Sequence, residues 1–184
     1  SNGCSTTSAA FVLNSTGPLV GTYTIDNTLA ASCPNYVSFA SAITDLNLLG
    51  VGGNVIFNIN QGYTETAPNG GLGINMCALG AGLQPNSAQT VIFQKVGVGP
   101  NPVIMAGTGS GSADIIFSLI GADYVTINGI DLTANPANVT AAEMTEIGYA
   151  LLKCSGTDGA QNNTIENSTI TLDKTNTNGS TAIY

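Results

Sequence analysis

Short alternations of apolar and polar residues predict that most of the chain forms β-strands. Across 55–60, Val55, Phe57 and Ile59 alternate with residues that would face the other way, and Gly62 closes the run. Similar short runs predict further strands at 20–25, 91–93, 103–105, 115–120, 124–132, 149–154, 163–172 and 181–184. The chain is therefore predicted to be mainly β.

One segment has helical spacing instead. Phe39, Ile43 and Leu46 follow one another at i, i+4 and i+7, which is typical of an amphipathic helix. Asn35 can cap the start of this helix, and a glycine follows its end. We predict a helix at about 36–49 whose three apolar side chains lie buried over the first coil of the strand region.

An internal repeat indicates how the strands are arranged. The string TING at 126–129 recurs 38 positions later as TIEN at 164–167, which places Gly129 opposite Asn167. These two residue types best tolerate a left-handed backbone at a tight turn. Upstream, 115–119 matches 150–154 at an offset of 35. Repeated strands joined by loops of variable length are typical of stacked coils.

These patterns predict an all-β fold, a right-handed parallel β-helix with an N-terminal capping α-helix. A β-sandwich also has short strands, but a helix followed by repeated coils fits it poorly. We expect 1–18 to be an N-terminal lead and 19–184 to be the β-helix domain, continuing beyond 184 in a longer chain. The expected coil core comprises Phe117, Leu119, Ile127, Leu132, Ile165 and Ile170.

Charge is scarce in this sequence. Only 8% of the residues are charged, and the net charge is −8 because eleven acids face three lysines and no arginine. Nucleic-acid binding requires basic side chains that neutralise phosphates, and anionic membranes attract basic segments as well. No apolar run approaches the roughly 20 residues that span a bilayer. We expect neither nucleic acid nor membrane insertion.

The four cysteines, Cys4, Cys33, Cys77 and Cys154, are widely spaced, and the chain has no histidine. Neither feature fits a zinc site. An even cysteine count fits an oxidising compartment, so we treat all four as disulfide candidates, with three possible connectivities, in a protein that is secreted or displayed at the cell surface. Buried free thiols are the alternative.

Acidic residues offer little for catalysis. Hydrolysis of a glycosidic bond uses an acid and a base across one bond, but the repeat stacks Glu166 on Asn128 and Asp131 on Thr169, so it brings no two acids together. Asp123 with Asp158 is the one feasible pair, and solvated turn acids are the simpler interpretation. The lysines Lys95, Lys153 and Lys174 would act as bases only if burial lowered their pKa. We expect no catalytic residues.

Hard oxygen ligands for Ca²⁺ occur in the later loops, at Asp158, Asn162, Asp173 and Asn176. No spaced calcium-loop motif accompanies them. Asp and Asn also form turns by bonding to nearby backbone groups. We expect no metal and no cofactor, with calcium as the alternative.

Several strings resemble known β-helix proteins. The order of helix, strand and a GxYxE-like string at 62–65 is similar to pectin methylesterases and pectate-lyase-like proteins. Five strings, GTYTI, GVGGNVIFNI, GYTE, YVTI and NNTI, at Gly21, Val51, Gly62, Tyr124 and Asn162, resemble β-helix modules of secreted surface proteins of Bacteroidota. This resemblance implies a cap helix over the open end, extracellular display, export by type IX secretion and a module without catalysis of its own.

We therefore expect a non-enzymatic extracellular module that serves as a rigid spacer or adhesion shaft. A polysaccharide-active lyase, hydrolase or esterase is one alternative. A subunit of a homopolymeric filament is another, because the open end of a coil stack presents unpaired strand edges. Expected partners are surface glycans or neighbouring subunits.

Overall fold

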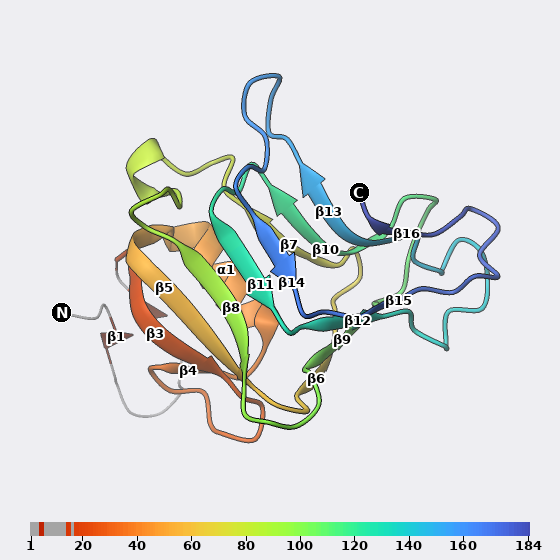
Figure 1. Ribbon diagram of the computed structural model, residues 1–184, viewed down its shortest axis with the longest axis horizontal. Helices are drawn as coiled ribbons and strands as arrows, with labels where there is room; N and C mark the ends of the chain where they lie inside the picture. The colour runs from red at the N-terminus through yellow and green to blue at the C-terminus, as the bar shows by residue number, and fades with distance from the viewer. Residues whose placement is uncertain (1–3, 6–13, 16) are drawn as a thin grey trace.

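Three parallel sheets enclose one core in the computed structural model, which describes residues 4–5, 14–15 and 17–184 (Figure 1). Sheet I contains β4 (Asn35–Tyr36), β3 (Leu19–Ile25), β5 (Val51–Asn60), β8 (Val91–Val96), β11 (Val125–Asn128) and β14 (Thr164–Glu166). Sheet II contains β6 (Thr64–Thr66), β9 (Val103–Met105), β12 (Asp131–Thr133) and β15 (Ile170–Thr171). Sheet III contains β7 (Leu72–Asn75), β10 (Ile115–Ile120), β13 (Ile147–Leu152) and β16 (Thr181–Ile183).

The chain passes from sheet I to sheet II to sheet III and returns, which makes it a parallel β-helix. The first coil has β3 and the helix α1 (Phe39–Leu49), and the second to fifth coils are β5–β7, β8–β10, β11–β13 and β14–β16. Every strand pair within these three sheets is parallel. The predicted fold, a parallel β-helix with an N-terminal helix, is confirmed.

Two minor elements lie outside the three sheets. An antiparallel pair, β1 (Cys4–Ser5) with β2 (Asn14–Ser15), lies near the N-terminus, and a 3₁₀ turn occurs at Ala81–Leu83.

The repeat at an offset of 38 is also confirmed. Ile127 pairs with Ile165 and Leu132 with Ile170, both in parallel register. Between them, Gly129 and Asn167 both adopt left-handed backbone conformations, with φ of 73° and 54°. These turns divide each expected strand, 124–132 and 163–172, into two, because the chain bends there from sheet I to sheet II.

The upstream alignment at an offset of 35 is wrong. Phe117 pairs with Tyr149 and Leu119 with Leu151, an offset of 32. The loop between β13 and β14 therefore absorbs six residues, not three. An odd shift of register exchanges the two faces of a strand, and 115–120 and 147–152 are too uniformly apolar for the sequence to reveal it.

Strands β6 and β7 were not predicted, because Thr64–Thr66 lacks apolar alternation and glycines precede Leu72.

Matching positions of successive coils form continuous rows in the core. One row runs along sheet I through Tyr23, Phe57, Phe93, Ile127 and Ile165. The Phe57 and Phe93 rings stack with centroids 4.5 Å apart. Of the expected core residues, Phe117, Leu119, Ile127 and Leu132 are buried, whereas Ile165 and Ile170 are half-buried because they belong to the fifth coil, which has a described neighbour on one side only.

The helix α1 covers the N-terminal end of the stack behind sheet I (Figure 1). Its side chains Phe39, Ile43 and Leu46 are buried, and it packs mainly against β7 and β3. Ser38 is the N-cap, with its hydroxyl accepting a bond from Ser41 N, so the expected cap at Asn35 is wrong. Asn35 instead lies in β4 and accepts a hydrogen bond from the Thr24 hydroxyl.

One disulfide joins two coils that are not neighbours. Cys77, after β7, is bonded to Cys154, after β13, with their Cα atoms 5.5 Å apart. Cys33 is disulfide-bonded as well, and no described cysteine is free. The Cys4 side chain and the 1–13 part of the expected lead, apart from the backbone of β1, lie outside the described residues.

Replacing Ile43 with alanine is expected to lower the free energy of unfolding by about 2–5 kcal/mol, because the side chain is only 4% exposed and its removal leaves a cavity. Leu48→Ala on the same helix is the matched control, since Leu48 is 71% exposed, and it should change stability by less than about 0.5 kcal/mol. Chemical denaturation measures both, and equal losses would contradict the capping role of this face.

Candidate functional site

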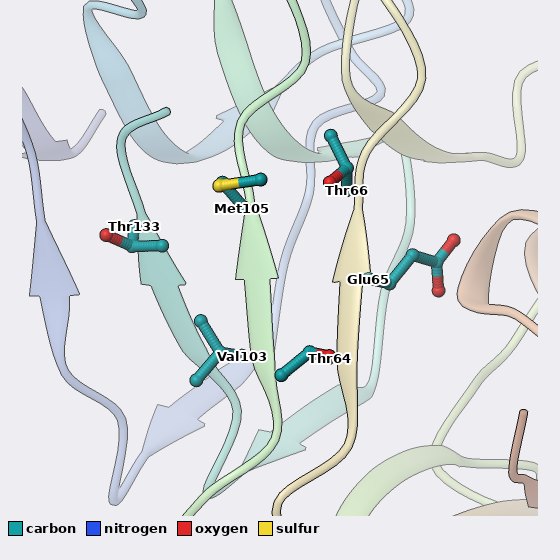
Figure 2. A pocket seen from close by; sticks show the side chains of 6 residues that line it. All are labelled: Thr64, Glu65, Thr66, Val103, Met105 and Thr133. Atoms are coloured by element: carbon teal, nitrogen blue, oxygen red, sulfur yellow. The ribbon is translucent and has the colours of Figure 1, made fainter. Parts of the chain in front are cut away.

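A shallow groove lies on the outer face of sheet II (Figure 2). It has a volume of about 250 Å³ and is lined by Thr64, Glu65, Thr66, Val103, Met105 and Thr133. Parallel register places Thr64 beside Val103, and Met105 between Thr66 and Thr133. Successive side chains of a strand point to opposite faces, so the threonines of β6 face the groove whereas Glu65 points away from it, toward α1 (Figure 2).

The groove combines an apolar floor with hydroxyl groups. Val103 and Met105 supply apolar surface, and Thr64 and Thr66 are exposed. The Thr133 hydroxyl donates to the backbone oxygen of Ala134 at 3.3 Å. Apart from Glu65, which faces the other way, the residues that line the groove are not ionisable, and Asp131, beside Val103 in the register of sheet II, accepts hydrogen bonds from the Asn101 amide and from Thr169 N.

Glu65 holds the start of the cap helix. Its carboxylate accepts hydrogen bonds from Phe39 N at 2.6 Å and from Ala40 N at 3.2 Å, two of the amides that a helix leaves unpaired at its N-terminus. The Tyr63 hydroxyl donates to the same carboxylate at 2.7 Å. Burial, followed by this hydrogen bond to Glu65, raises the pKa of Tyr63 above its ordinary value. The 62–65 string therefore has a structural role that its resemblance alone did not reveal.

The other acids are used in the same way. Nine of the eleven carboxylates accept hydrogen bonds from the protein: Asp26, Asp45, Glu65, Asp114, Asp123, Asp131, Glu143, Glu146 and Asp173. Buried Glu146, for example, accepts from Asp114 N and from the Asn176 amide, both at 2.8 Å. Backbone and amide donors stabilise these charges in place of cationic side chains.

The proposed acid pair is divided between two loops of neighbouring coils. Asp123 precedes β11, and its carboxylate accepts a hydrogen bond from Gln161 N at 2.6 Å. Asp158 precedes β14, and its backbone oxygen accepts from Cys154 N at 2.8 Å. Asp123 thus connects two loops, whereas the Asp158 bond lies within its own loop, and neither residue lines the groove on sheet II.

The calcium candidates also bond locally. The Asp173 carboxylate accepts from Thr175 N at 2.8 Å, and the Asn176 side-chain oxygen accepts from Asn178 N at 3.0 Å. Asn162 has a left-handed backbone with φ of 56°. Within the described part of the chain, no group of three or more His, Cys, Asp or Glu residues is arranged to hold a metal ion. Among the lysines, Lys95 donates to Gly99 O at 3.1 Å, and Lys153 and Lys174 are exposed.

Comparisons with known proteins add no family to this picture: no family model, curated protein or solved structure matches the chain. The helix found in residues 17–184 is too short to cross a membrane. The fold and the groove together define a parallel β-helix with a shallow, outward-facing groove on sheet II.

Replacing Glu65 with alanine is expected to cost about 1.5–3 kcal/mol of stability, because it removes a charged acceptor from two helix amides and one hydroxyl. Glu65→Gln keeps one acceptor oxygen and should cost less. Glu166→Ala is the matched control, since Glu166 is exposed and has no side-chain hydrogen bond, and it should be neutral. Thermal or denaturant unfolding that ranks Glu65→Ala with the control would contradict the role of Glu65.

Asp45 gives a pH prediction with a definite sign. Burial raises the pKa of this carboxyl, although the hydrogen bond from Tyr36 lowers it in part. The folded state then binds the proton more tightly than the unfolded state, so this group lowers stability as pH rises from the unfolded pKa through the folded one. Asp45→Asn should therefore gain stability relative to the natural chain between pH 3 and pH 7. An unchanged difference across that range would be the contradicting result.

Proposed function

We propose that this protein is a non-enzymatic extracellular β-helix module that acts as a rigid spacer or adhesion shaft. The observation that carries the proposal is the use of the acids: most are already bonded to backbone amides or neutral side chains that connect turns and coils. A glycosidase or lyase needs acids or bases that are free to exchange protons with a substrate. The groove on sheet II is lined mainly by apolar side chains and threonine hydroxyls, which supports a binding role.

Rigidity is supported by bonds between equivalent positions of successive coils. Besides the strand ladders, side chains join residues 36–39 positions apart in the sequence: Asn54 with Thr90, Asn58 with Gln94, Asp123 with Gln161, Asn163 with Val125, Asp131 with Thr169 and Asn167 with Asn128. Each of these bonds fixes one coil against the next. A stack held in this way keeps its length and orientation, as a spacer requires.

Extracellular placement is supported by the cysteine chemistry. Disulfides persist in oxidising compartments and are rare in reducing ones, and Cys77, Cys154 and Cys33 are all disulfide-bonded. The strings at Gly21, Gly62, Tyr124 and Asn162 resemble surface modules of Bacteroidota, which agrees with display at a cell surface and with export by type IX secretion.

Adhesion would use the groove on sheet II. Its floor of Val103 and Met105 beside threonine hydroxyls suits a sugar ring, which has an apolar face and hydroxyl edges. The net charge of −8 disfavours acidic polymers, so neutral surface glycans are the proposed partners.

Incubation with pectin, polygalacturonate or alginate, with and without Ca²⁺, is expected to release no unsaturated products and no reducing ends. Turnover that is lost in Asp123→Asn or Asp158→Asn would contradict the non-enzymatic proposal and favour a polysaccharide-active enzyme.

A binding arm of the same experiment tests the groove with a panel of neutral oligosaccharides by calorimetry. Met105→Glu should abolish any binding found, because it places a charge on the groove floor. Val98→Glu is the matched control, since Val98 is fully exposed on a turn outside this groove, and it should leave binding unchanged. Equal binding by both variants would exclude this groove as the glycan site.

A further inference from the structure

We infer that the Cys77–Cys154 disulfide makes the third and fourth coils a length-limited unit, so that the β-helix bears tension along its axis without extending there. This inference rests on the proposed function as a spacer and adds a mechanical role to it. It begins with the position of the bond. Cys77 follows β7 and Cys154 follows β13, and β10 lies hydrogen-bonded between those two strands in sheet III.

The disulfide crosses three stacked segments of chain. Met76 N donates to Ile120 O at 3.1 Å, and Gly121 N donates to Leu152 O at 2.9 Å, so the ladder continues through all three segments up to the cysteines. Strands two positions apart in a sheet are separated by about 9.5 Å. The Cα atoms of Cys77 and Cys154 are nevertheless 5.5 Å apart, because the two chains converge beyond the ends of their strands.

Gly121 makes this convergence possible. It directly follows β10 and has a left-handed backbone, with φ of 54°. A Cβ atom at this position would overlap the Cys154 sulfur. The middle coil therefore has no side chain where the disulfide passes over it, and the two outer coils can be linked directly.

The mechanical consequence follows from the topology. Each coil of a solenoid contacts only its neighbours, so force applied at the two chain ends can separate the coils one after another. Residues 77–154 include every strand from β8 to β13, and the bond closes a loop between two cysteines that are 77 positions apart in the sequence. While the bond is intact, the force passes through it, and that segment cannot lengthen. The hidden length is the extended length of the segment between the two cysteines, which the disulfide keeps from being pulled out. It is about 250–280 Å, at 3.3–3.6 Å per extended residue.

Single-molecule force spectroscopy on the full 184-residue chain, held by handles at both ends, tests this inference. The oxidised chain should reach a contour length about 250–280 Å shorter than the Cys77→Ser/Cys154→Ser double variant. Ala78→Ser/Ser155→Ala is the matched control, because it changes the adjacent residues and keeps the disulfide, and it should behave like the natural chain.

Two further arms do not depend on the double variant folding. Adding dithiothreitol to a Cys33→Ser chain, which lacks the other disulfide, should lengthen the same molecule by about 250–280 Å, as the reagent is oxidised to its cyclic disulfide and Cys77 and Cys154 are reduced to thiols. Gly121→Val should prevent closure of the bond, leaving two more thiols that react with a thiol reagent than in the natural chain.

The outcomes separate the inference from the proposal on which it rests. Equal contour lengths in the oxidised chain, the reduced chain and the double variant would overturn the length limit. A shortened contour in which the other coils extend without a resolved force peak would overturn the tension-bearing role, because the spacer function would fail although the crosslink is present. Turnover of a glycan would contradict the non-enzymatic proposal and leave the contour lengths unaffected.

Discussion

Parallel stacking is the constraint on which the rest of this structure depends. Each strand must give its backbone hydrogen bonds to the strands of adjacent coils, so a residue is defined by its row as much as by its place in the sequence. The row from Tyr23 through Phe57 and Phe93 to Ile127 shows the result, since aromatic rings fill its N-terminal part and a branched residue continues it. The same stacking leaves an end that must be covered, and α1 covers it.

Parallel stacking of coils also explains why charged residues are scarce in this chain. A turn that repeats in every coil would bring like charges close together, and neutral Asn and Thr side chains avoid that repulsion while still bonding from coil to coil. The few acids that remain are placed where backbone amides converge, as Glu65 is at the start of α1 and Glu146 is beside Asp114 N. These hydrogen bonds are the observation on which our proposal of a structural module rests.

Glu65 and Gly121 depart from the repeating pattern of the stack, and each depends on a neighbouring segment. Glu65 occupies an inward-facing position of β6, in the row of Ile104, Leu132 and Ile170, and can do so because the helix amides lie across from it. Gly121 similarly leaves a gap at the end of β10 that the disulfide fills. In each case one coil supplies space or donors that another coil uses, which is how a repetitive fold acquires distinct sites.

The sequence by itself determined the fold class, the cap helix and the rows through Ile127 and Leu132, because apolar periodicity and left-handed turn residues are local properties that repeat with the coil. It did not determine the register between β10 and β13, since both segments are mostly apolar and loop lengths are free to vary. Nor did it reveal the groove, the partners of Glu65 or the pairing of Cys77 with Cys154. Those depend on which residues of different coils come to lie side by side, and only the stacked tertiary structure fixes the distances between residues so far apart in the chain.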